Sequence, residues 1–147
     1  FPIYNDGLIV DAIGRALDGK QPKWLRYGGA AEYAKYCYGT PNGVYVVVED
    51  VISAVTVATV FPDVTGFALL GTSLTDAHKE CLSDSASYVM VALDPDALRK
   101  TLIMRKEIEA WCDIPTRAIR LRDDIKYQDV EDMDLIGRWI DVAEKSH

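Results

Sequence analysis

Val44-Tyr45-Val46-Val47-Val48-Glu49 is an apolar run that ends on an acidic residue, and Tyr88-Val89-Met90-Val91-Ala92-Leu93 is a second such run, followed by Asp94 and Asp96. Each run has the length and composition of a buried strand in a parallel sheet. Residues that follow such strands lie at the carboxyl edge of the sheet, where open α/β folds keep their ligand sites. The sequence therefore predicts that Glu49, Asp94 and Asp96 gather at one edge of an α/β fold.

Strands and helices alternate along the chain after residue 43. The expected strands are 44–48, 65–70, 88–93 and 116–121, and the expected helices are 51–61, 76–85, about 96–111 and 133–144. The short connections between them imply a parallel four-stranded sheet with helices on both faces. Thr75 is expected to cap its helix, and Gly71 to permit the tight turn that precedes this helix.

The first 43 residues have a different pattern. Residues 3–10 contain an Asp-Gly turn signal between two β-prone pieces, which predicts a β-hairpin. Residues 14–29 are rich in Gly, Pro and basic side chains and are expected to be loop, and residues 30–38 a short helix. We therefore divide the chain into an N-terminal basic extension with a short β-hairpin, 1–43, and a main α/β domain, 44–147.

The charge is unevenly distributed along the chain. The net charge of −7 argues against simple electrostatic binding of nucleic acid, which favours a positive surface. Residues 15–27 nevertheless have four basic side chains against one acidic, a net charge of +3, whereas residues 123–134 have six acidic against one basic, a net charge of −5. Basic and acidic functions are therefore expected at separate places along the chain.

Size and composition exclude several classes of protein. A chain of 147 residues that is 49% hydrophobic suits one globular domain with its own core. No stretch approaches the roughly 20 apolar residues of a membrane span, and the first residues lack the features of a signal peptide, so we expect no membrane contact and a cytoplasmic location. The three cysteines lack the spacing of a zinc site or a disulfide framework.

Carboxylates at the ends of neighbouring parallel strands converge, because such strands lie about 4.8 Å apart. A cluster of this kind is costly unless a cation neutralises it, and oxygen ligands favour Mg²⁺ or Mn²⁺ over zinc. Magnesium is often shared between one or two carboxylates and substrate phosphates, which would reconcile an acidic protein with an acidic substrate. A structural alternative stays open, in which Glu49, Asp50 and Asp94 only cap the helices that follow them.

Three short motifs in this order resemble the Toprim domain of bacterial and bacteriophage DnaG-type DNA primases. They are Val46–Glu49, Leu69–Thr75 with His78, and Ala92–Ala97 with Arg99-Lys100, and the run Lys126–Met133 looks like the later acidic loop of the family. The stretch Gly14–Leu25 is similar to the segment that precedes Toprim in the primase catalytic core. The resemblance covers roughly residues 8 to 134, and it implies a Toprim-like fold.

The resemblance also implies an activity in DNA replication, namely Mg²⁺- or Mn²⁺-dependent synthesis of short RNA primers on single-stranded DNA from ribonucleoside triphosphates. Glu49 matches the family's strand-end glutamate, which acts as metal ligand or general acid/base, and Asp94 with Asp96 matches its Asp-x-Asp pair. By this comparison Asp129 is the expected additional metal ligand, and Asp132 is the alternative.

Basic residues of the N-terminal segment match the family positions that hold nucleotide phosphates or template. These are Arg15 and Lys23, to which the neighbouring Arg26 and, after Asp-x-Asp, Lys100 are added as candidate nucleic-acid contacts. Members of the family contact a replicative helicase, and such a contact would require parts outside these 147 residues. The chain would then be a core fragment, or a compact relative from a bacteriophage-like genome acting in the cytoplasm of its host.

The sequence departs from the family after Glu49. The family has glycine at the next position and an acidic residue four positions on, where this chain has Asp50 and Ser53. Three other functions therefore stay open: a Toprim nuclease, a Toprim-like scaffold that holds DNA or a replication partner without catalysis, and a receiver-like signalling domain. The basic segment before residue 27 favours primase over nuclease, and Lys126 fits a receiver domain poorly.

Overall fold

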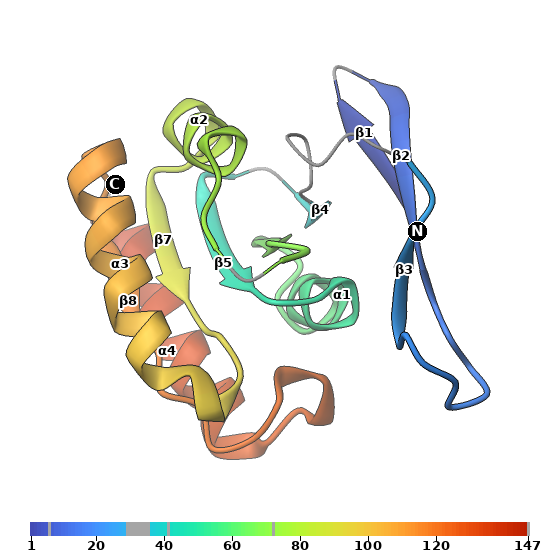
Figure 1. The fold of residues 1–147 in the computed structure, drawn as a ribbon. Coiled ribbons are helices and arrows are strands. Elements are labelled where there is room, and N and C mark those ends of the chain that lie inside the picture. Colours follow the sequence, from blue (N-terminus) through green and yellow to red (C-terminus); the bar gives the residue numbers. More distant parts are fainter. Residues whose placement is uncertain (6, 29–35, 41, 72, 147) are drawn as a thin grey trace.

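The computed structural model describes residues 1–5, 7–28, 36–40, 42–71 and 73–146. The elements in chain order are β1 (Pro2–Asn5), β2 (Leu8–Arg15), β3 (Trp24–Arg26), β4 (Tyr36–Gly39), β5 (Val44–Val48), α1 (Val51–Val60), β6 (Thr65–Ala68), α2 (Asp76–Ser85), β7 (Tyr88–Val91), η2 (Pro95–Ala97), α3 (Leu98–Cys112), β8 (Thr116–Ala118), η3 (Ile125–Tyr127) and α4 (Val130–Lys145). They form a small sheet of β1, β2 and β3 and a larger sheet of the other five strands (Figure 1).

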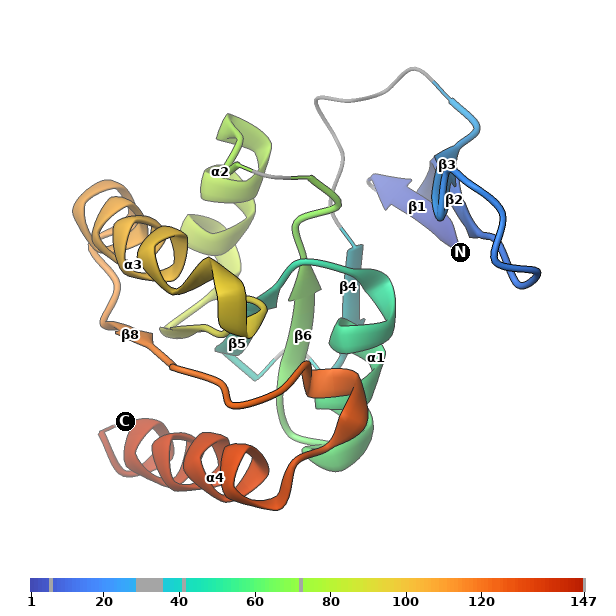
Figure 2. The ribbon, with the colours of Figure 1, turned by 60° about the horizontal axis from the view of Figure 1, so that its bottom comes forward.

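The larger sheet has the strand order β4-β6-β5-β7-β8. The strands β6, β5, β7 and β8 are parallel, which confirms the predicted parallel four-stranded sheet, and β4 joins its edge antiparallel to β6. All five residues of β5 are buried, because helices cover both faces of the sheet. Figure 2 shows α2 and α3 on one side of the sheet and α4 with α1 on the other.

The alternation of side chains along β5 divides the core into two clusters. Val44, Val46 and Val48 pack with residues of α1 and α4, whereas Tyr45 and Val47 pack with residues of α2 and α3. A continuous apolar run is therefore what a strand between two helical layers requires. The two clusters bury opposite faces of β5 and hold this strand in the centre of the sheet. Glu49, the residue after β5, is thereby held at the carboxyl edge of the sheet.

The helices α1 and α2 begin at polar caps. The Thr75 hydroxyl accepts a hydrogen bond from the His78 backbone N–H at 3.3 Å, and His78 Nδ1 accepts one from the Thr75 N–H at 3.0 Å. This reciprocal pair confirms Thr75 as a helix cap. Asp50 caps α1, where its carboxylate accepts a hydrogen bond from the Ser53 N–H at 2.8 Å.

Close packing between α1 and β6 depends on Gly66. A Cβ atom at this position would lie 2.0 Å from the carbonyl oxygen of Ala54. Only glycine lets the backbones of strand and helix approach this closely. The start of α1, and with it Asp50, is thereby held against the edge of the sheet.

The N-terminal region differs in part from expectation. The hairpin of β1 and β2 is confirmed, but residues 14–29 are not all loop, because β2 continues to Arg15 and Trp24–Arg26 pairs with it as β3. Residues 36–38 are strand rather than helix, because β4 completes the edge of the larger sheet and the Tyr36 and Tyr38 rings stack at 6.4 Å. Residues 30–35 of the expected helix lie outside the described residues.

A small apolar cluster joins the two sheets. Ile3 and Ile13 of the small sheet are buried with Val51 at the start of α1, and Figure 1 shows the small sheet beside this helix. The division at residue 43 stays a prediction, although β4 lies before it and pairs with the larger sheet. Among the described residues, no helix is long and apolar enough to cross a membrane.

Candidate functional site

A pocket of about 440 Å³ lies at the carboxyl edge of the larger sheet, where the small sheet closes its other side. Four carboxylates and two lysines line it: Glu49, Asp50, Asp94, Asp124, Lys23 and Lys126. We call this the acidic pocket. Its acidic side comes from the strand ends and from the segment around η3, and Lys23 comes from the connection between β2 and β3.

Adjacent parallel strands bring Glu49 and Asp94 to this pocket. Glu49 directly follows β5, Asp94 lies three residues after the end of β7, and the two strands pair in register. The backbone continues this alignment past the strand ends, since the Ala92 N–H donates to the Val47 carbonyl at 2.9 Å and the Leu70 N–H to the Glu49 carbonyl at 3.2 Å. The structure thus places two of the three predicted strand-end acids on one cavity.

The four carboxylates of the pocket are not equivalent. Asp50 is engaged as the cap of α1, and Asp124 forms an ion pair with Lys126 at 2.7 Å. The side chains of Glu49 and Asp94, by contrast, make no hydrogen bond or ion pair with the part of the chain that the structure describes. Asp50 therefore fits the capping alternative, whereas Glu49 and Asp94 do not.

Burial is the main reason why the pKa values of Glu49 and Asp94 are raised. Burial raises the pKa of Glu49 above its usual value, the Asp94 charge raises it further, and Lys100 partly opposes the shift. Burial also raises the pKa of Asp94, with an added contribution from Asp124 that Lys126 partly offsets. Two partly buried carboxylates near each other disfavour ionisation, so a bound cation would relieve the cost of their charge.

Asp96 lies at the rim of the pocket rather than among its lining residues. It is exposed in the first turn of η2, and its charge contributes to the raised pKa of both Glu49 and Asp94. Over the described ranges, no three His, Cys, Asp or Glu side chains are close enough to hold one metal ion together. Glu49 and Asp94 alone still fit Mg²⁺, because this ion often takes two carboxylates and completes its shell with water and phosphate oxygens. The metal role of all three residues stays a prediction.

The later acidic run is arranged differently from what the sequence suggested. Asp129 is the cap of α4 and accepts a hydrogen bond from the Asp132 N–H at 3.1 Å. Asp132 is only 2% exposed, and its carboxylate accepts hydrogen bonds from the backbone N–H groups of Arg122 and Asp123 at 2.9 to 3.1 Å. Both acids therefore support the local backbone, and Asp124 is the residue of this run that lines the pocket.

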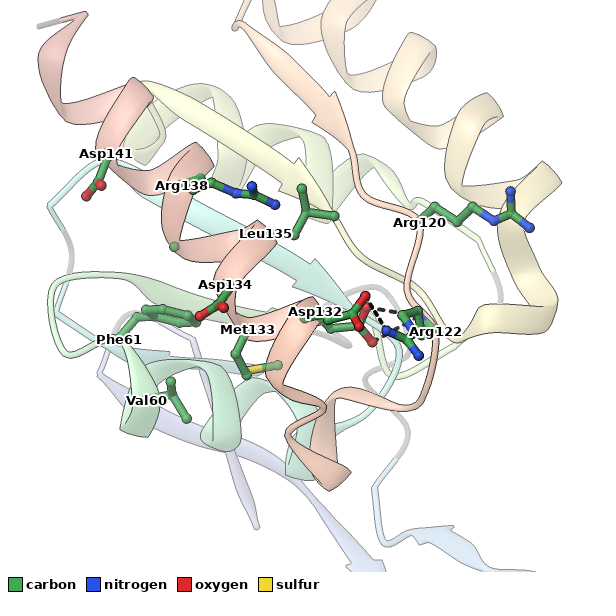
Figure 3. Close-up of a pocket in the computed structure, with 12 residues that line it drawn as sticks. Val60, Phe61, Arg120, Arg122, Asp132, Met133, Asp134, Leu135, Arg138 and Asp141 are labelled. Carbon is green, nitrogen blue, oxygen red and sulfur yellow. Dashed lines mark hydrogen bonds and ion pairs between the residues drawn. The ribbon is translucent and has the colours of Figure 1, made fainter.

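Figure 3 shows Asp132 and Arg122 in a second pocket, of about 800 Å³, between the end of α1 and α4. Arginine and acidic side chains alternate around it, and Arg122 pairs with Glu131. The second pocket is larger than the acidic pocket, and its charged lining consists of three arginines and four acidic residues: Arg120, Arg122, Arg138, Glu131, Asp132, Asp134 and Asp141. Its balanced charges do not indicate one class of ligand.

The predicted basic residues have different environments. Lys23 is exposed and lines the acidic pocket. Trp24, the next residue in sequence, packs with Arg15, whose guanidinium lies 5.4 Å from the centre of the Trp24 ring. Lys100 is partly buried, and its charge lowers the pKa of Glu49. Lys23 therefore lies in the lining of the pocket, and Lys100 lies outside this lining but near enough for its charge to act on Glu49.

Arg26 has a structural partner. Its guanidinium pairs with the Asp11 carboxylate at 3.1 Å, and the Asp11 side chain is fully buried. Burial favours the neutral form of Asp11, but backbone N–H groups of Ala12 and Gly28 together with Arg26 outweigh it, so the pKa of Asp11 lies below its usual value. This ion pair links β3 to β2. It gives Arg26 a structural role that does not involve nucleic-acid binding.

A strained residue also lines the acidic pocket. Leu70 follows β6 with φ +56°, a left-handed conformation that is uncommon for any residue but glycine. The expectation that Gly71 makes this turn is wrong, because Gly71 is not among the residues with positive φ. Strain of this kind is concentrated at functional sites.

No protein-family profile matches the sequence, and no curated protein matches it. Among solved structures, the chain is similar to the zinc-binding and RNA polymerase domains of Aquifex aeolicus primase, with a TM-score of 0.72 and 20% identity, over 96% of this chain and 39% of that one. It is similar to a DnaG primase catalytic domain bound to single-stranded DNA, with a TM-score of 0.65 and 20% identity, over 96% and 50%. The E. coli primase catalytic core gives a TM-score of 0.67 and 22% identity, over 92% and 50%.

These similarities confirm the Toprim-like α/β fold of a DnaG-type primase catalytic core that the sequence motifs suggested. At such identities the likeness concerns the fold. The chain spans between 39% and 50% of the length of the three structures.

Proposed function

We propose that this chain is a primase-type nucleotidyl-transfer core that makes short RNA primers on single-stranded DNA with Mg²⁺ or Mn²⁺. The observation that carries the proposal is the pair of partly buried carboxylates, Glu49 and Asp94, which make no hydrogen bond or ion pair with the described residues and share a pocket with Lys23. The similar fold of a primase catalytic domain bound to single-stranded DNA supports the choice of template.

The two sides of the acidic pocket suit two parts of one substrate. Glu49 and Asp94 would hold the metal ion, and Asp96 would add negative charge at the rim. A bound divalent ion would neutralise the triphosphate and make the attacking 3′-hydroxyl easier to deprotonate. Lys23 is placed to donate hydrogen bonds to phosphate oxygens from the opposite side, as a mobile point charge.

Residues 1–43 and 44–147 would then divide the work. The N-terminal region supplies Lys23 and the Arg15–Trp24 pair, and the main domain supplies the acids. This arrangement would let an acidic chain bind an acidic template, because Lys23 and Arg15 add positive charge on the side opposite Glu49 and Asp94. A replicative helicase would bind through segments outside these residues, and the enzyme would act in the cytoplasm, that of the host if the source is a bacteriophage.

The test combines primer synthesis with isosteric substitutions. The protein is incubated with single-stranded DNA, labelled ribonucleoside triphosphates and Mn²⁺ or Mg²⁺. Glu49→Gln and Asp94→Asn are compared with Asp141→Asn, which removes an exposed carboxylate of α4 outside the acidic pocket. We expect primer-length RNA from the unsubstituted protein and from Asp141→Asn, and a loss on the order of 10²-fold or more in the other two variants.

Other outcomes assign other functions. Metal-dependent cutting of the DNA that requires Glu49 and Asp94 would identify a nuclease. Retention of DNA that neither substitution changes, without RNA synthesis, would identify a binding scaffold. Circular dichroism and thermal melting of each variant separate loss of the site from loss of the fold.

A further inference from the structure

The acidic pocket contains a positively charged side chain of the protein itself, Lys126. Lys126 Nζ lies 2.7 Å from Asp124 Oδ2, and the lysine side chain is only 14% exposed. A lysine this well buried is uncommon unless it is paired. Neither residue of this pair was singled out by the strand-end pattern that predicted Glu49 and Asp94.

The segment that carries Lys126 is anchored by burial and by backbone hydrogen bonds. Ile125, between the two charged residues, is 2% exposed and belongs to the main core. The Tyr127 N–H donates to the Asp124 carbonyl at 2.9 Å and the Gln128 N–H to the Ile125 carbonyl at 2.9 Å, which closes the turn of η3. The Tyr127 ring centre lies 5.5 Å from Lys126 Nζ. Lys126 therefore differs from a surface lysine, whose charge can move freely into solvent.

This pair divides the pocket into two unlike halves. In one half the charge of Asp124 is neutralised by Lys126, and in the other Glu49 and Asp94 have no partner among the described residues. The fixed positive charge also acts on the open half, because Lys126 partly offsets the repulsion at Asp94. A divalent ion that binds beside Glu49 and Asp94 is therefore repelled by the Lys126 ammonium group.

We propose that Lys126 is a built-in counter-cation that weakens divalent-ion binding in the acidic pocket, so that the ion is taken up together with the substrate triphosphate. The inference rests on the proposed metal site and assigns a specificity-determining residue to it. A triphosphate supplies the negative charge that two carboxylates beside a lysine lack. Lys126 thus disfavours a metal ion held permanently by protein groups alone.

The experiment is a titration of the protein with Mn²⁺, followed by electron paramagnetic resonance of the free ion, with and without a ribonucleoside triphosphate. Lys126→Met and Lys126→Gln remove the charge, Lys126→Arg keeps it, and Lys106→Met removes an exposed charge of α3 as a control. Without nucleotide we expect both neutral variants to bind Mn²⁺ at least about tenfold more tightly than the unsubstituted protein. Lys126→Arg and Lys106→Met should stay within about threefold of it.

Equal Mn²⁺ affinity in the unsubstituted protein and both neutral variants would overturn the inference, and so would an absence of binding in all of them. Tighter binding by Lys126→Arg as well would overturn it too, because the effect would then come from packing and not from charge. Primer synthesis is scored separately on the same samples. A gain of Mn²⁺ affinity without any primer synthesis would leave this inference standing and count against the proposed function.

Discussion

Replacing Asp132 by alanine should lower the free energy of unfolding by about 3 kcal/mol. The buried carboxylate accepts hydrogen bonds from the backbone N–H groups of Arg122 and Asp123. Hydrogen bonds to a charged group contribute about 1.5–3 kcal/mol each, so the two donors together give about 3–6 kcal/mol. The lower end applies here, because Arg122 and Asp123 are exposed residues whose N–H groups can reach water after a small movement.

The assay is equilibrium unfolding in urea at pH 7, followed by tryptophan fluorescence and circular dichroism. Asp132→Asn keeps one acceptor oxygen and should lose about half as much, on the order of 1.5 kcal/mol. Asp134→Ala, on the exposed face of the same helix, should stay within about 0.5 kcal/mol of the unsubstituted protein.

The Asp132 substitution should also affect the acidic pocket, because Asp132 holds the backbone that leads to Asp124. If Asp132→Ala unfolds within about 0.5 kcal/mol of the unsubstituted protein, or if Asp134→Ala loses as much, the assignment of Asp132 as the anchor of this segment is wrong.

Two further predictions follow from the packing and the charges. Gly66→Ala should destabilise the protein by about 3 kcal/mol or more, because the new Cβ would lie 2.0 Å from the Ala54 carbonyl oxygen, and a loss below about 1 kcal/mol in thermal or urea unfolding would contradict this close approach. In metal-free buffer, the raised pKa values of Glu49 and Asp94 mean that the native state holds protons that the unfolded chain has released, so their contribution to stability falls as the pH rises from about 4 through the raised values. Unfolding free energies measured from pH 4 to 8 in the presence of EDTA should fall less steeply for Glu49→Gln than for the unsubstituted protein. Identical slopes would contradict the raised pKa of Glu49.

The larger sheet could be predicted because its strands are buried on both faces. Val44–Val48 is apolar at every position, and such a run has few alternatives to a central strand between two helical layers. Thr75 was predictable for a local reason, since the residues that complete its capping box lie within one turn. The same logic placed Glu49 and Asp94 at the edge of the sheet, and the acidic pocket contains both.

The remaining features depend on contacts between distant segments. Tyr36–Gly39 becomes a strand because β6, 25 or more residues later, offers an edge, and four residues are too few for the β propensity of the two tyrosines to decide between a strand and the end of a short helix. Asp124 and Lys126 enter the pocket because buried Ile125 orients η3, whereas the sequence pointed to Asp129. An apolar residue flanked by opposite charges was the available signal for them.

The small apolar cluster that joins the two sheets affects how the protein responds to amino-acid substitutions. Ile3, Ile13 and Val51 form most of its buried apolar contact, whereas the five-stranded sheet has two extensive clusters of its own. Substitutions in this cluster would alter the spacing between Lys23 and the carboxylates while most of the folding free energy is retained. Selection could therefore adjust which ligands fit between the two sides of the acidic pocket with little change in the stability of the larger sheet.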